Sequence, residues 1–156
     1  MAARKEDYLL RMIEELRECV VRALRLRNQA AIEEALLAVV QARERLFARP
    51  SAEFASLPVD QQLELLSLGQ DSVAARGRCL AYALILKEAA LVYEVQGDPA
   101  LAASAFQLAL YIHLIVAVQS PEDFAALREP INDLLCRLDV DGLYPPVKAL
   151  LTQLPL

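Results

Sequence analysis

Few residues of this sequence have side chains typical of catalysis or metal binding: a single histidine, His113, and three cysteines, Cys19, Cys79 and Cys136. Imidazole beside a nucleophile can act as a general base, and imidazole with thiolates can hold zinc. However, no serine or cysteine stands with His113 in a recognisable motif, and the cysteines are far apart with no C-x-x-C pair. We therefore predict no catalytic residue, no metal site and no cofactor. His113 is expected to bond a carbonyl or carboxylate within a helix, and the cysteines to be buried free thiols.

Asp139, Asp141 and Gly142 have the spacing of the first residues of a calcium-binding loop. The next four residues, 143–146, supply no further oxygen ligand, and no closing glutamate follows. The segment is therefore predicted to be a polar turn.

Composition predicts one all-helical domain that spans residues 1–156. Hydrophobic residues make up 56% of the chain, with only four glycines and no tryptophan, and no segment alternates polar and apolar residues as a strand does. The mean hydropathy of +0.31 is high for a soluble monomer, which favours apolar surface that is covered by a second copy or another partner.

The charge distribution argues against nucleic-acid binding. The net charge is −5, and residues 51–156 carry six Lys or Arg against thirteen Asp or Glu. Residues 1–50 carry ten against eight, too evenly mixed for a basic patch.

Helical periodicity and stop signals divide the chain into a helical hairpin at 5–49, an irregular insert at 50–70, a second hairpin at 71–119 and C-terminal helices at 120–154. The predicted helices, which fall within the expected range of six to eight, are 5–27, 28–49, 51–57, 59–68 (starting near Asp60), 71–96, 99–119, 120–138 and 145–154. Gly77 is expected to allow close approach of another backbone, and Pro130 to kink or divide its helix.

The segment from Leu86 to Ala109 has the spacing of a tetratricopeptide unit: Leu86-x2-Ala89-Ala90-x2-Tyr93, then Gly97, Ala102, Phe106 and Ala109. It resembles that family of antiparallel helical hairpins, which stack into a right-handed superhelix. A fainter copy places Ala35, Val39 and Ala42 where Ala102, Phe106 and Ala109 stand. The opening helix, with Asp7-Tyr8-Leu9-Leu10-Arg11-Met12-Ile13-Glu14-Glu15-Leu16, also resembles an uncharacterised bacterial family of tetratricopeptide-like proteins.

This resemblance implies a non-enzymatic module for protein or peptide binding or for self-association, with a homodimer as the expected form. In such hairpins the first helix of each pair lines an inner groove. Carried over to this sequence, the groove residues are Arg17, Val20, Leu24, Arg27, Leu84, Lys87, Leu91 and Glu94.

Two other readings of the sequence stay open. Residues 100–118 are apolar enough to cross a bilayer, but acidic flanks and three polar side chains favour a core helix, so we expect no membrane and a cytoplasmic protein. The alternative function is a small-molecule-binding protein or an enzyme with a pocket between helices near His113.

Overall fold

The computed structural model describes the backbone of residues 2–156 and the side chains of residues 7–156, and its described part is all-helical with no strand. This confirms the prediction of an all-α fold with six to eight helices. The seven α-helices are α1 (Ala2–Leu26), α2 (Gln29–Phe47), α3 (Val59–Ser67), α4 (Ser72–Gln96), α5 (Pro99–Gln119), α6 (Phe124–Cys136) and α7 (Pro145–Leu151). The short 3₁₀ turns are η1 (Ser51–Glu53), η2 (Pro121–Asp123) and η3 (Val140–Gly142).

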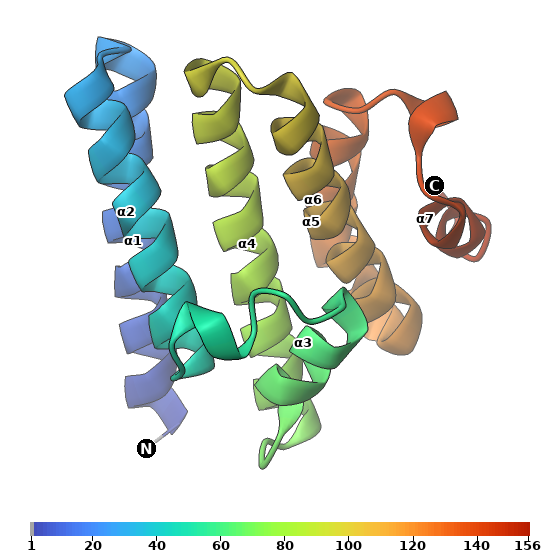
Figure 1. Ribbon diagram of the computed structural model, residues 1–156. Coiled ribbons are helices and arrows are strands. Elements are labelled where there is room, and N and C mark those ends of the chain that lie inside the picture. The colour runs from blue at the N-terminus through green and yellow to red at the C-terminus, as the bar shows by residue number, and fades with distance from the viewer. Residues whose placement is uncertain (1) are drawn as a thin grey trace.

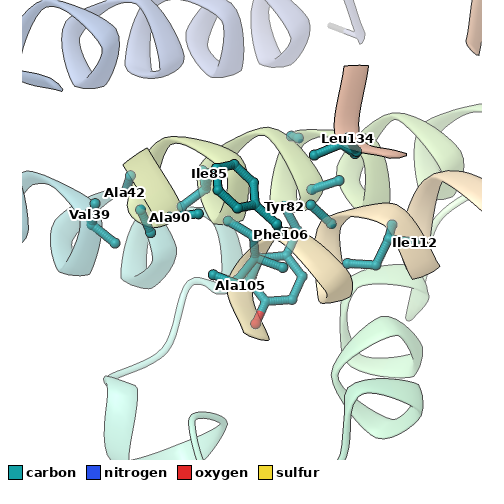
Figure 2. Close-up of a cluster of buried hydrophobic side chains, with 14 of the residues drawn as sticks. Val39, Ala42, Tyr82, Ile85, Ala90, Ala105, Phe106, Ile112 and Leu134 are labelled. Atoms are coloured by element: carbon teal, nitrogen blue, oxygen red, sulfur yellow. The ribbon is translucent and has the colours of Figure 1, made fainter. Parts of the chain in front are cut away.

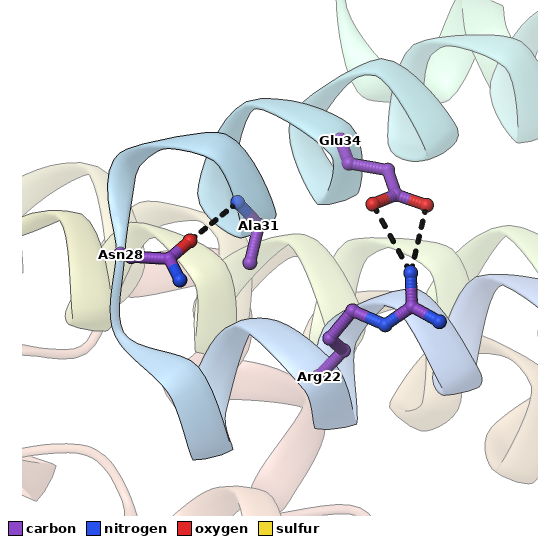
Figure 3. A network of polar contacts seen from close by, with 4 residues as sticks. All are labelled: Arg22, Asn28, Ala31 and Glu34. Atoms are coloured by element: carbon purple, nitrogen blue, oxygen red, sulfur yellow. Dashed lines mark hydrogen bonds and ion pairs between the residues drawn. The ribbon is translucent and has the colours of Figure 1, made fainter.

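Side-chain caps fix where three of the long helices begin. The Asn28 side chain accepts a hydrogen bond from the Ala31 amide at 2.9 Å (Figure 3), and Asp98 does the same for Leu101 at 3.1 Å. Asp71 caps α4 in the same way. These bonds satisfy amides that have no partner inside the helix, which is why the sequence located the starts of α2, α4 and α5 closely.

Short, irregular segments differ most from the predicted boundaries. Only 51–53 of the expected helix 51–57 is helical, whereas α3 begins at Val59, directly after Pro58, and ends at Ser67, close to the predicted 59–68. The Ser120 side chain makes no capping bond, so that segment opens as a 3₁₀ turn before α6. Pro130 does not divide α6, because the buried stripe of Leu127, Ile131 and Leu134 packs the helix on both sides of it. The last helix ends at Leu151 instead of 154.

Helix α4 is the centre of the protein. It packs against α1 and α2 on one side and α5 on the other, while α3 lies across its lower end (Figure 1). Helix α5 in turn packs against α6 and α7, which stand at the opposite end of the molecule from α1 and α2. Helices α1 and α2 run in opposite directions, as do α4 and α5, because each pair is joined by a short connection.

Small and large side chains alternate in the core around α4 (Figure 2). Ala90 and Ala109 are fully buried, and so is Ala35 in α2. Alanine at these positions lets helix axes approach closely, and the large Phe106 side chain, only 2% exposed, is buried in the same core. The alanines and the phenylalanine of the repeat pattern are therefore core residues, while membership of the tetratricopeptide family stays a prediction.

Gly77 does not serve the purpose expected of it. A Cβ atom built at this position would meet no atom within 4 Å, so no neighbouring backbone approaches it. The residue lies on the exposed face of α4 near the start of that helix. The expectation of a close backbone contact is therefore wrong.

Helix α5 is long and apolar enough to span a membrane by length and composition, alone among the helices of the described residues. In this fold 61% of its apolar window is buried inside the protein. That burial is compatible with a soluble protein whose central helices share one core.

Candidate ligand groove over helix α4

The apolar residues assigned to an inner groove are largely in the core. Val20 is only 1% exposed and therefore presents no surface to a partner. Leu24, Leu84 and Leu91 are half-buried and pack against the core cluster. They pack there because α4 lies directly against α1, so the space between these helices is filled by their own side chains.

The charged residues assigned to the same groove divide into paired and exposed ones. Arg17 bonds Glu88 at 3.3 Å, and Lys87 Nζ lies 3.1 Å from Asp133 Oδ2. The hydrogen bond from Lys87 holds the pKa of the Asp133 carboxyl below its usual value. Two cations of the predicted groove are thus bonded to carboxylates of this chain.

The remaining two charged residues of that set, Arg27 and Glu94, are exposed. Arg27 adopts a left-handed backbone conformation and donates its Nε–H to the Leu24 carbonyl at 3.3 Å. The eight assigned residues therefore do not form one open surface.

His113 is a buried core residue with a carbonyl partner. It is 4% exposed, and its Nδ1 lies 2.8 Å from the Ala109 carbonyl oxygen. Burial lowers the pKa of the imidazole, which favours the neutral ring. His113 lines neither of the two cavities described below.

The cysteines and the acidic turn form no metal cluster, since no group of three metal-binding side chains occurs in the described part of the chain. Cys79 is buried and Cys19 half-buried, but Cys136 is exposed, which corrects the expectation for that thiol. Cys136 is exposed because it is the last residue of α6 and lies beyond its buried stripe. Asp139 accepts a hydrogen bond from the Asp141 amide at 3.1 Å, as in a polar turn.

A groove of about 290 Å³ lies over α4, between α2 and α5, and we call it the α4 groove. Its floor is one face of α4, because positions spaced by four, three and four residues fall on the same side of a helix. The floor residues are Tyr82, Leu86, Ala89 and Tyr93. The walls are Arg43 from α2 and Leu101, Ser104, Ala105 and Leu108 from α5. The end near Tyr82 is closed by Ala55, Leu57, Val59 and Gln62.

A chain of polar contacts crosses the closed end of the α4 groove. Arg43 Nη2 donates to the Tyr82 hydroxyl at 3.4 Å, and that hydroxyl donates to Gln62 Oε1 at 2.7 Å. Gln62 Nε2 then donates to the Phe54 carbonyl at 3.0 Å. Burial raises the pKa of Tyr82, so the phenol stays protonated and keeps donating. The contacts tie α2, the insert and α4 together around the groove.

Among the described residues that line the α4 groove, Arg43 is the only charged one, and no described side chain is its counter-ion. Its guanidinium carbon lies 5.7 Å from the Phe54 ring centroid and 5.8 Å from that of Tyr82. Its Nε is buried without a hydrogen-bond partner. No carboxylate lies within 4.0 Å of it among the described side chains. The groove thus combines apolar walls with one uncompensated cation.

A second cavity, of about 500 Å³, lies between α3, α4 and α5, but most of its charged groups already have partners. Arg76 Nε lies 3.3 Å from Asp123, and the Tyr111 hydroxyl donates to Asp60 at 2.8 Å. Burial and the bond to Asp60 raise the pKa of Tyr111 to about 12. The α4 groove is the stronger candidate because its charge is unmatched.

Arg43, Tyr82 and Gln62 were not singled out from the sequence, although two of them left a signal in it. Arg43 stands four residues after Val39 and four before Phe47, so it interrupts a buried stripe of α2. Gln62 similarly stands four residues before Leu66 on the buried side of α3. A polar residue within an apolar stripe indicates a buried bond or a site.

The fold and the groove define a class: an all-α protein with an apolar groove that contains one arginine. Compared with models of protein families, with curated proteins and with solved structures, the chain shows no match. A proposal for its function therefore rests on the groove.

Proposed function

We propose that this protein is a non-enzymatic, tetratricopeptide-like interaction module of the cytoplasm, and that it binds a helical segment of a partner protein in the α4 groove. The observation that carries the proposal is the groove of about 290 Å³, whose floor and walls come from three long helices and are mainly apolar. Apolar grooves between helices are a recurrent way to hold the apolar face of an amphipathic helix.

The length of the groove suits a short helix. Its floor extends from Tyr82 to Tyr93, and eleven residues of α-helix rise roughly 16 Å, or about three turns. Leu101, at the rim, is 44% exposed and is available to cover such a segment. A partner helix with apolar residues spaced by three or four positions would match the floor of the groove.

Self-association is a second candidate, favoured by exposed apolar residues on α1. Leu10 is 59% and Val21 58% exposed. Leu10 stands seven residues before Arg17 and Val21 four residues after it, so all three side chains lie on one face of α1. Burial of these side chains against a second copy would form the homodimer expected from the hydropathy. Sedimentation at micromolar concentration tests it: a particle above 17.3 kDa supports the dimer, and a monomer overturns it.

The alternative of a small-molecule site or an enzyme near His113 has less support. The imidazole already bonds the Ala109 carbonyl, and no described cavity opens onto it.

The experiment selects binders from a displayed library of twelve-residue helical peptides and measures their affinity by calorimetry. Leu101→Gln at the groove rim should weaken a selected peptide about tenfold, since one buried leucine contributes roughly 1.5–3 kcal/mol. Leu37→Gln is the matched control, because Leu37 is 57% exposed on α2 and does not line the groove. Equal affinity of both variants, or no enriched peptide, would overturn the proposal.

A further inference from the structure

We infer that the segment bound in the α4 groove carries a single aspartate or glutamate whose carboxylate pairs with Arg43 at the closed end. This inference rests on the proposed function and specifies its partner. It concerns a protein segment with one acid among apolar residues.

The first argument is the state of Arg43. A guanidinium stays charged in proteins, and a buried N–H without an acceptor is costly. The Arg43 Nε is such a group, and its neighbours are two aromatic rings and the Tyr82 hydroxyl. The tyrosine donates its own proton to Gln62, so it supplies no negative charge to Arg43. No described side chain supplies a carboxylate to Arg43, so we assign that role to the bound segment.

The second argument is the shape of the guanidinium and its surroundings. The planar fork of arginine matches a planar carboxylate through two parallel hydrogen bonds. The closed end is bounded by the small or apolar side chains of Ala55, Leu57 and Val59, which leave room for a carboxylate and add no second cation. A larger, more highly charged anion would leave most of its charge uncompensated there.

The third argument is the charge of the whole protein. The chain carries a net charge of −5, and residues 51–156 alone have thirteen acidic against six basic side chains. A strongly acidic partner would be repelled at long range. One carboxylate between apolar residues gains the bond to Arg43 without that repulsion. The apolar side chains should stand one and two helical turns from the acid, where Leu86, Ala89 and Tyr93 line the floor.

The test compares peptides selected on the native protein with the same peptides in which the acid is changed from Glu to Gln. On the native protein this change should weaken binding about tenfold, the effect of one charge-assisted hydrogen bond. On Arg43→Gln it should have less than a twofold effect. Arg43→Lys keeps the charge without the fork and should fall between the two. Equal effects of the peptide change on native protein and Arg43→Gln would overturn the pairing.

A spectroscopic readout covers the case in which Arg43→Gln does not fold. In the native protein, the selected peptide should shift the nuclear magnetic resonance signal of the Arg43 Nε–H group, and its Gln version should not. Arg45, on the same helix as Arg43, is the matched control: its Nη1 lies 4.0 Å from Glu15 of α1, and its signal should not shift. An unmoved Arg43 signal with bound peptide overturns the inference.

The two proposals fail in distinguishable ways. Peptides that bind, are weakened by Leu101→Gln and show no acidic preference would leave the groove function intact and overturn only the role of Arg43. Peptides insensitive to Leu101→Gln would overturn the groove as the binding site, and the inference with it.

Discussion

Arg17 of α1 and Glu88 of α4, which are 71 positions apart in the sequence, form an ion pair with Arg17 Nε 3.3 Å from Glu88 Oε1. Glu88 is only 7% exposed, and burial raises the pKa of its carboxyl, while the nearby Arg17 charge opposes that rise. The pair connects the first helix to the central one. It also explains why Arg17 is a structural residue in this fold.

Replacement of Arg17 by methionine should destabilise the protein. The change leaves the buried Glu88 carboxylate without its partner, which costs about 1–3 kcal/mol of unfolding free energy. Urea unfolding followed by circular dichroism measures the difference. The double variant Arg17→Met with Glu88→Met should recover part of the loss, because it buries no unpaired charge.

The loss in Arg17→Met should also depend on pH. A carboxyl whose folded pKa is raised opposes folding while it is ionised, and this cost disappears as the pH falls through the folded pKa. Without Arg17 that pKa rises further, so the deficit relative to native protein should shrink as the pH falls from neutral toward 4.5, the ordinary pKa of a glutamate carboxyl. A deficit independent of pH would contradict this account of Glu88.

Tyr82→Phe should loosen the insert that closes the α4 groove. The change removes the 2.7 Å hydrogen bond to Gln62 and leaves the buried amide oxygen without its donor, a loss of about 1–3 kcal/mol. Amide hydrogen exchange should accelerate in α3 more than in α5. Equal acceleration of exchange in α3 and in α5 would refute the assignment.

Gly77→Ala and Gly97→Ala should change stability in opposite directions. Neither new methyl group meets an atom within 4 Å, so only the backbone conformation differs. Gly77 lies inside α4, where alanine is favoured by about 0.5–1 kcal/mol. Gly97 ends the same helix at φ +90°, a conformation that costs alanine roughly 1 kcal/mol or more. Thermal unfolding of the two variants measures both changes in stability. If Gly77→Ala destabilised the protein, the new methyl group would have to meet an atom that is absent from this structure, and the structure around Gly77 would be contradicted.

His113→Ala should destabilise the protein without weakening a peptide bound in the α4 groove. The folded pKa of His113 is lowered by burial, so the unfolded chain takes up a proton first as the pH falls below about 6.5, and native stability declines there. His113→Leu fills most of the volume and should abolish that part of the acid-side decline. Unfolding curves between about pH 7 and pH 5 measure it, and an unchanged decline would exclude His113 as its source.

Local chemistry made much of this fold predictable. The boundary between α4 and α5 is set by neighbouring residues: the left-handed Gly97 ends α4, the Asp98 side chain caps α5, and Pro99 begins it. Such signals depend only on residues close by in the sequence. The all-α fold class was likewise predictable, from composition and helical periodicity. The same local rules were insufficient for 51–57 and 120–124, where 3₁₀ turns depend on how neighbouring helices pack.

The site depended on information that no local pattern contains. The sequence by itself determined the helices, their caps and the alanine-rich contact between α4 and α5. Only the tertiary structure decided that Arg17 and Lys87 are paired with Glu88 and Asp133, and that Arg43 has no carboxylate beside it. The physical reason is that the pairing of a charge depends on which side chains lie within a few ångströms, and residues up to 71 positions apart meet only when the helices pack.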